Sequence, residues 1–181
     1  MRLIGTLVVF VIGSHAPSAG LVVHLGTTDG QLEIALAKSG DTLVHGLTLS
    51  DASLQKTRQA ITQANLYGLA SVEKVSSFAR LPSVSNLVNV LIVDLDQLGK
   101  WAADQKELLR PLIPGGELRF KKNGTWQKKI KPTPGGMDEW THWDHDASGN
   151  PASTDIYVRP PTSLQWYAGP STTDNGADKV G

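Results

Sequence analysis

The sequence contains no cysteine, which excludes disulfides, thiolate nucleophiles and cysteine metal sites and leaves the redox compartment open. It has no excess of charge either, because 17 basic residues balance 17 acidic ones. A neutral chain gives no global attraction to nucleic acid or to an anionic membrane surface, so a partner has to be recognised locally. There are no internal repeats. With 181 residues, of which 40% are hydrophobic, the chain can bury one core of ordinary size.

No apolar run is long enough to cross a membrane, which needs roughly 20 residues. The run Leu3–Ile12 follows Arg2 and precedes small residues from Gly13 to Ala19. This layout is typical of a secretory signal peptide cleaved before Ala19. We therefore expect residues 1–18 to direct export to the periplasm or cell envelope, with no stable membrane anchor. A first buried strand or an ordinary hydrophobic N-terminus, in a cytoplasmic protein, is the alternative.

The stretch that organises the rest of the chain lies next. Leu21–Leu25 is a short apolar run typical of a strand buried on both faces. Gly26 and Gly30 frame a loop that opens a predicted helix over Gln31–Ser39. Glycines let the backbone approach a ligand closely, and the first N–H groups of a helix attract a carboxylate or phosphate. The stretch therefore predicts a site for a small-molecule ligand.

The remaining pattern alternates between strands and helices. We expect further strands and helices over Thr42–Leu47, Ser50 or Asp51 to Ala64, Ala70–Val75, Asn86–Asp94, Gln97–Arg110, Glu117–Lys122 and Thr125–Ile130. Pro111, Pro114, Gly115 and Gly116 are expected to end the second long helix with a sharp turn. Asn123-Gly124 fits a two-residue hairpin turn. The order predicts an α/β fold: a Rossmann-like three-layer sandwich whose mostly parallel sheet ends in an antiparallel hairpin.

The character of the sequence changes after Lys131, where prolines and glycines surround an aromatic and acidic patch. We expect no helix there and only a lone strand at Leu164–Tyr167. The predicted organisation is a signal peptide over 1–18, a Rossmann-like domain over 19–131, and a linker over 132–181. A single strand has no partner for pairing, so this linker is expected to lead into a further region.

Three segments resemble the successive motifs of class I S-adenosylmethionine-dependent methyltransferases: Val22–Gly30, Leu43–Thr48 and Leu108–Gly116. The resemblance covers residues 20–130. It implies that the chain is a methyltransferase-like domain with S-adenosyl-L-methionine as its cofactor.

A second resemblance concerns the end of the chain. Met137–Asn150 and Pro160–Pro170 are similar to the junction in large bacterial proteins that join a methyltransferase-like domain to a pyrroloquinoline-quinone-binding-like β-propeller. In those proteins the propeller follows the junction. The resemblance implies a propeller domain as a partner of this chain.

The first resemblance implies a cofactor site made by Gly26, Thr28, Asp29, Gly30 and Thr48. Thr28 replaces the middle glycine of the motif, and His24 replaces the acidic residue common at the end of the strand. Thr48 stands where the family has a carboxylate that accepts both ribose hydroxyls, and it offers a single hydroxyl. Because a hydrogen bond to a charged group contributes roughly 1.5–3 kcal/mol, this change alone weakens binding about tenfold to a hundredfold. The methyl acceptor and the catalytic residues cannot be named.

A cluster of metal-capable side chains lies in the linker: Asp138, Glu139, His142, Asp144, His145 and Asp146. A His-x-x-His pair could meet on one metal. However, no helix or strand fixes the geometry of the cluster and no full ligand set is present, so we predict no metal site. The preferred interpretation is a hydrated linker whose Trp140 and Trp143 pack on the domain.

The predicted hairpin is basic and aromatic, with Arg119, Lys121, Lys122, Lys128, Lys129 and Lys131 beside Phe120 and Trp126. Such a surface could bind a phosphate backbone. Lysines on an exposed sheet edge also prevent strand-to-strand aggregation. We favour this second role, with no nucleic-acid partner, because the chain as a whole is neutral.

Two functions remain open from the sequence. The first is a methyltransferase-like domain that binds its cofactor weakly or has lost it. The second is a non-catalytic exported module leading into a quinone-binding-like propeller. Export favours the second, because the cofactor is made in the cytoplasm and its charges oppose passage through a bilayer.

Overall fold

The computed structural model describes residues 20–38, 42–99 and 103–157. The signal peptide predicted over 1–18 and the strand predicted at Leu164–Tyr167 lie outside these residues. The chain divides into two compact units, Met1–Thr133 and Pro134–Gly181. Among the described residues, no helix combines the length and the apolar character that a membrane crossing requires.

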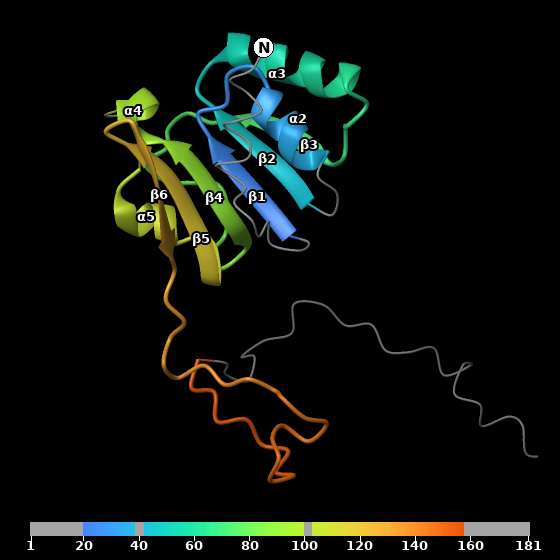
Figure 1. The fold of residues 1–181 in the computed structure, drawn as a ribbon, viewed down its shortest axis with the longest axis vertical. Coiled ribbons are helices and arrows are strands. Elements are labelled where there is room, and N and C mark those ends of the chain that lie inside the picture. The colour runs from blue at the N-terminus through green and yellow to red at the C-terminus, as the bar shows by residue number, and fades with distance from the viewer. Residues whose placement is uncertain (1–19, 39–41, 100–102, 158–181) are drawn as a thin grey trace, which may run out of the picture. The chain divides into compact units, whose positions relative to one another are not determined.

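The first unit is an α/β domain (Figure 1). Its elements in chain order are β1 (Gly20–Leu25), α2 (Gln31–Ala37), β2 (Thr42–Thr48), α3 (Asp51–Gln63), β3 (Ala70–Lys74), β4 (Val88–Asp94), α4 (Leu95–Leu98), α5 (Gln105–Leu109), β5 (Leu112–Lys122) and β6 (Thr125–Ile130).

The six strands form one sheet in the order β3-β2-β1-β4-β5-β6. All neighbours run parallel except β5 and β6, which form the predicted antiparallel hairpin. From β1 the chain first adds β2 and β3 on one side, and then adds β4, β5 and β6 on the other. The strand order therefore reverses at β1. Ligands of open α/β sheets bind outside the carboxyl ends of the strands at such a switch point. The fold predicted from the sequence is confirmed.

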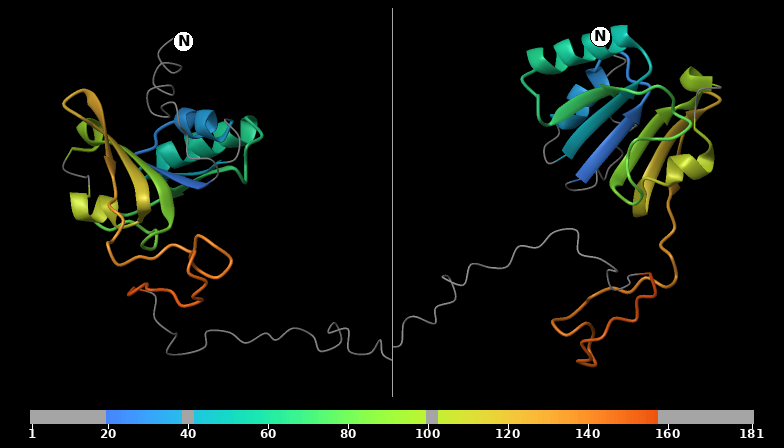
Figure 2. Two further views of the ribbon diagram at one scale, coloured as in Figure 1. Left: turned by 60° about the horizontal axis from the view of Figure 1, so that its bottom comes forward. Right: turned by 180° about the vertical axis from the view of Figure 1, so that it is seen from behind.

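Helices α2 and α3 cover one face of the sheet, and α5 lies on the opposite face (Figure 2). Alternate residues of the central strands therefore point into two separate cores. Val22 and Ile92 belong to the cluster under α2 and α3. Val23 and Leu91 belong to the cluster on the other face. Burial of β1 and β4 on both faces explains why each reads as a nearly continuous apolar run.

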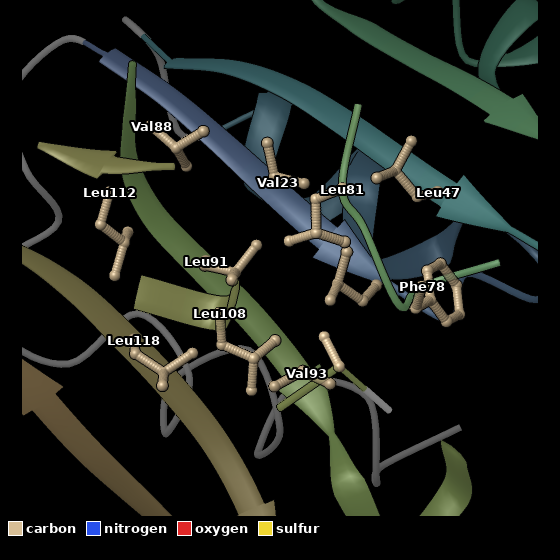
Figure 3. Close-up of a cluster of buried hydrophobic side chains, with 12 residues drawn as sticks. Val23, Leu47, Phe78, Leu81, Val88, Leu91, Val93, Leu108, Leu112 and Leu118 are labelled. Atoms are coloured by element: carbon tan, nitrogen blue, oxygen red, sulfur yellow. The ribbon is translucent and has the colours of Figure 1, made fainter. Parts of the chain in front are cut away.

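The connection from β3 to β4 contains no helix, and a loop covers the sheet in its place. Phe78 and Leu81 insert from this loop into the second core, where they are 1% and 3% exposed. Figure 3 shows them facing Val23, Leu47 and the side chains of β4. Burying a side chain of this size contributes about 1.5–3 kcal/mol, so the loop acts as a third layer.

A charged pair on α5 holds the same loop in place. Glu107 accepts a hydrogen bond from the backbone N–H of Leu81 at 2.7 Å. Arg110 is bound to Glu107 and donates to the carbonyl oxygens of Leu81 and Ser83, both at 2.8 Å. These contacts hold the pKa of Glu107 below its ordinary value, mainly through the hydrogen bond from Arg110. Backbone N–H and carbonyl groups of the loop therefore find hydrogen-bond partners although the loop forms no helix.

The single helix predicted over Gln97–Arg110 is wrong. Helix α4 ends at Leu98 and is followed by Gly99, whose φ of 53° and ψ of −124° leave the helical region. Helix α5 starts separately, with the carboxylate of Asp104 accepting from the N–H of Glu107 at 2.7 Å. A glycine and a capping aspartate thus divide an apolar pattern that has helical spacing throughout.

The turn predicted at residues 114–116 is a bulge within β5. Val88 pairs with Leu112, but Val90 pairs with Glu117. Between these two pairings β5 therefore contains more residues than β4, and the extra residues of β5 have no partner in β4. Gly115 takes a φ of 77°, which suits the irregular backbone of a bulge. Proline and glycine mark this irregularity as they mark a turn.

The second unit is described over residues 134–157, and these residues contain no helix. Asp138 is its centre: its Oδ2 accepts hydrogen bonds from the N–H of Thr154 at 2.6 Å and the hydroxyl of Ser153 at 3.0 Å. His145 Nε2 lies 2.5 Å from the same oxygen. Backbone and side-chain donors hold the pKa of Asp138 well below its usual range. The unit is therefore organised by one carboxylate.

Candidate functional site

A cavity of about 270 Å³ opens where β1 and β4 end. It is lined by His24, Gly26, Thr27, Thr28, Asp29, Gln31, Leu32, Glu33, Asp94, Gln97, Lys121 and Trp126. These residues come from the loop after β1, the start of α2, the end of β4 and the hairpin. The cavity therefore lies at the switch point of the sheet, where the fold places ligands.

The loop after β1 is shaped by Gly26. Its φ is 87°, a left-handed conformation that side chains other than glycine rarely take. An added Cβ would lie 2.8 Å from Cδ2 of Leu98, so the backbone approaches α4 closely. The N–H groups of Gly26 and Thr27 both donate to the carbonyl of Leu47, at 2.9 and 3.1 Å. The turn is thus tied to β2.

A buried carboxylate lies directly behind this loop. Glu33, on α2, is 1% exposed, and its Oε1 is 2.6 Å from Nδ1 of His24. The hydroxyl of Thr27 donates to the same oxygen. Burial alone raises the pKa of Glu33, but the hydrogen bonds from His24 and Thr27 and the attraction to His24 outweigh it and hold this pKa below its ordinary value. Glu33 is therefore ionised and paired.

The opposite wall carries a second pair of charges. Asp94, the last residue of β4, accepts from the N–H of Gln97 at 3.0 Å and lies 3.3 Å from Nζ of Lys121. Lys121 pairs across the hairpin with Trp126, and both line the cavity. The sheet topology thus brings three separate elements to one wall.

The predicted cofactor residues fall into two groups. Gly26, Thr28 and Asp29 line the cavity. Gly30 lies outside the lining and starts α2 with a φ of 77°, where an added Cβ would lie 3.0 Å from Cγ2 of Thr57. Thr48 also lies outside the lining: it is 3% exposed, and its hydroxyl accepts from the N–H of Ser50 at 3.2 Å. The structure therefore brings together the loop residues but not the residue that ends β2.

Among the lining residues that sequence reasoning did not assign to the site are Glu33, Asp94, Lys121 and Trp126. A signal existed for Glu33, because it shares the buried face of α2 with Leu36 and Ala37 at helical spacing. A charged residue on such a face has to be paired. Asp94 was visible as the polar residue ending the most apolar strand.

Some of the basic side chains of the hairpin are paired with nearby carboxylates. Arg119 and Lys128 pair with Glu117 at 2.6 and 3.2 Å. Lys131 donates to the carbonyl oxygens of Arg110 and Leu112. The hairpin therefore presents fewer free cations than its sequence indicates.

The aromatic side chains of the second unit differ in exposure. His145 is buried, and the ring of Trp140 meets it edge-on with centroids 5.4 Å apart. Trp143 is 95% exposed. Within the described part of the chain, no group of three histidine, aspartate or glutamate side chains is arranged to hold a metal ion.

No protein-family model and no curated protein sequence matches the chain. Solved structures share its fold. A candidate S-adenosyl-L-methionine-dependent methyltransferase from Methanococcus maripaludis matches with a TM-score of 0.57 and 22% sequence identity. The match covers 66% of this chain and 55% of the methyltransferase. The [4+2]-cyclase SpnF matches with a TM-score of 0.56 and 20% identity, over 64% of this chain and 43% of its own.

Geranyl diphosphate C-methyltransferase from Streptomyces coelicolor A3(2), in complex with S-adenosyl-L-homocysteine, matches with a TM-score of 0.55 and 18% identity, over 66% of this chain and 45% of its own. The chain thus spans about half the length of these structures. The domain has a methyltransferase-like Rossmann fold, and at these identities the likeness concerns the fold alone.

The described residues fit S-adenosylmethionine only in part. Gly26 and Asp29 line the cavity, as the resemblance implies for the loop after β1. No carboxylate from the end of β2 lines the cavity, and the hydroxyl of Thr48 is already engaged. The cavity volume also lies just below the roughly 300–1,000 Å³ typical of ligand pockets. The cavity therefore offers no acceptor from the end of β2, where the resemblance places the ribose carboxylate.

Proposed function

We propose that this chain is a methyltransferase-like module whose binding of S-adenosylmethionine is weak or lost. The observation that carries the proposal is the position of Thr48. Its side chain is buried outside the cavity, and its one hydroxyl accepts from Ser50. The site therefore retains a glycine loop without the acceptor that would hold a ribose.

The expected loss of affinity follows from that missing acceptor. A hydrogen bond to a charged group contributes roughly 1.5–3 kcal/mol, so its absence weakens binding about tenfold to a hundredfold. Thr28 adds to this effect, because its side chain lines the cavity where the family has a glycine. Without firm binding of the donor, methyl transfer has no support from the remaining residues.

Isothermal titration of the full chain with S-adenosylmethionine and S-adenosylhomocysteine tests this proposal. Thr28→Gly opens the cavity and is expected to tighten binding. Thr125→Gly, at an exposed position outside the lining, is the matched control and is expected to change nothing. Tight binding by the unaltered chain, together with methyl transfer to any acceptor, would contradict the proposal.

We propose, as the alternative, a role that requires export of the chain. The unit Pro134–Gly181 is distinct from the Rossmann domain, and its described residues surround Asp138. This separation favours a non-catalytic module leading into a quinone-binding-like propeller in the cell envelope. Cell fractionation with sequencing of the mature N-terminus tests it: a periplasmic protein starting at Ala19 is expected, and a cytoplasmic protein that retains Met1 would refute export.

A further inference from the structure

A second cavity, of about 360 Å³, lies at the opposite edge of the sheet from the hairpin. It is formed by helix α3, by strand β3, which is the last strand on that side, and by the connection between them (Figure 1). We call it the α3–β3 groove, and its lining consists of Arg58, Ile61, Thr62, Tyr67, Ala70, Ser71 and Val72. None of these residues lines the cavity after β1. The groove is therefore a separate place for a ligand.

The local structure brings these side chains together in a simple way. Arg58, Ile61 and Thr62 stand at positions i, i+3 and i+4 of α3, so they share one face of the helix. Ala70 and Val72 alternate along β3 and belong, with Ile61, to the core beneath α3. The groove therefore combines an apolar part, made by these core residues, with polar side chains along its helix side.

Arg58 is the one charged side chain in the lining, and a guanidinium stays protonated at every pH that the protein meets. Arg110 and Arg119 each pair with a glutamate, but no carboxylate among the described residues pairs with Arg58. The positions three and four residues away on α3 hold only uncharged residues: Leu54, Gln55, Ile61 and Thr62. The charge of this long, flexible side chain is therefore available to a ligand in the groove.

The surroundings of Arg58 favour a single negative charge. Arg58 and Thr62 lie in the second half of α3, and the C-terminal end of a helix carries a partial negative charge. One cation beside this end suits a monoanion better than a doubly charged phosphate. A carboxylate also matches the planar guanidinium, because the two can form a pair of parallel hydrogen bonds. The groove therefore favours a carboxylate over other anions.

The remaining lining favours an apolar body on the same ligand. Tyr67 is 84% exposed at the groove, and an exposed aromatic ring gains contact area when a flat apolar group packs on it. The hydroxyl groups of Tyr67 and Thr62 can donate further hydrogen bonds to an anion. These features together describe a molecule with one carboxylate and a small apolar or aromatic part.

We propose that the α3–β3 groove binds a small organic monocarboxylate, whose carboxylate pairs with Arg58 and whose apolar body packs on Tyr67. The volume of about 360 Å³ lies within the roughly 300–1,000 Å³ of ligand pockets. The proposal uses no residue of the cavity after β1. It therefore stands or falls separately from the binding of S-adenosylmethionine.

The experiment titrates the full chain with benzoate and follows the backbone amides by nuclear magnetic resonance. We expect saturable shifts at Arg58, Thr62 and Val72, which line the groove. The amides of Gly26 and Asp29, which line the other cavity, are expected to stay unchanged. This contrast shows which of the two cavities the probe occupies.

Three further probes separate the features of the ligand. Benzamide keeps the shape of benzoate without its charge, and it is expected to bind about tenfold more weakly or worse. Acetate keeps the carboxylate without the ring and is expected to bind more weakly than benzoate. Inorganic phosphate, which has more charge and no apolar body, is also expected to bind more weakly than benzoate.

Substitution of Arg58 tests the charge. Arg58→Gln is expected to weaken benzoate about tenfold, because it removes a charged hydrogen-bond donor. Arg58→Lys keeps the charge without the planar fork, so its loss is expected to be smaller. Lys56→Gln is the matched control: it removes the same charge from an exposed position of α3 that lies outside the lining. It is expected to leave binding unchanged.

Substitution of Tyr67 gives an independent readout. Tyr67→Ala is expected to weaken benzoate about twofold to tenfold and to leave acetate nearly unchanged. Tyr67→Phe keeps the ring and is expected to retain most of the affinity for benzoate. This pattern separates packing on an aromatic ring from a general effect of the substitution on the groove.

Several results would overturn the proposal. One is the absence of any saturable shift with benzoate, or a shift confined to Gly26 and Asp29. Another is binding of benzamide or phosphate as tight as that of benzoate. Unchanged binding in a folded Arg58→Gln variant is a third. If that variant fails to fold, the comparison of benzoate with benzamide on the unaltered chain decides.

Discussion

Replacing Glu33 by glutamine tests the role of the buried carboxylate most sharply. The substitution keeps the size of the side chain and removes its charge. In the unaltered chain, Oε1 of Glu33 accepts from both His24 and Thr27. A neutral amide oxygen accepts more weakly than a carboxylate, and the new NH₂ group has to find an acceptor in a region that is 1% exposed.

The expected effect at neutral pH is a loss of about 1–3 kcal/mol in the free energy of unfolding. Hydrogen bonds to charged groups contribute roughly 1.5–3 kcal/mol, and neutral ones roughly 0.5–1.5 kcal/mol. Two bonds are weakened, while the burial of a charge is relieved, so the net effect lies well below the sum of the two bonds. Urea denaturation followed by circular dichroism measures it.

The sign of the pH dependence follows from the lowered pKa of Glu33. A carboxyl group whose pKa is lower in the folded state stabilises the fold above its ordinary value of 4.5, and this stabilisation is lost as the pH falls through the folded pKa. The stability difference between the unaltered chain and Glu33→Gln is therefore expected to be constant near neutrality and to shrink below about pH 4.5.

Glu73→Gln is the matched control for this experiment. Glu73 also pairs with a histidine, His45, but at 3.5 Å and with 57% of its side chain exposed. Exposed pairs contribute roughly 0–1 kcal/mol, so this variant is expected to match the unaltered chain within about 0.5 kcal/mol. A Glu33→Gln variant that is as stable as the unaltered chain, with a difference that does not vary with pH, would refute the reasoning.

Three further changes have defined outcomes. Gly26→Ala forces a side chain into a left-handed backbone and against Leu98, and urea denaturation should show a loss of about 1–3 kcal/mol. Glu107→Ala removes the partner of Arg110 and an acceptor for the loop before β4, so hydrogen exchange of that loop should accelerate well above that of β1. Ser50→Ala removes the cap of α3 and should cost about 1 kcal/mol by thermal denaturation; unchanged stability would contradict the assigned cap.

The strands were predictable because a strand that is buried on both faces requires a nearly continuous run of apolar residues. Apolar runs such as Leu21–Leu25 and Val88–Asp94 tolerate few polar residues. The hairpin was predictable for a different reason, since Asn123-Gly124 takes positive φ at both positions, as a two-residue turn requires.

The sequence did not predict that the loop connecting β3 to β4 covers one face of the sheet. Phe78 and Leu81 are isolated apolar residues in a polar segment, and no periodicity marks them as core. Their burial depends on Glu107 and Arg110, which are distant in the sequence. Only the folded sheet brings these partners together.

The candidate site was predicted in part for similar reasons. Gly26 and Asp29 belong to one contiguous loop, so local sequence identified them. Asp94, Lys121 and Trp126 reach the same cavity through the pairing of β4, β5 and β6, which only the topology reveals. The position of Thr48 also required the structure, because its burial excludes it from the lining.

The most direct test of the central claim is the dissociation constant of S-adenosylmethionine for the full chain, measured by isothermal titration. A site with a glycine loop and no ribose carboxylate is expected to give a value above about 100 μM, or no detectable heat. A dissociation constant below about 1 μM would show that the cavity holds the cofactor without that carboxylate, and would contradict the account.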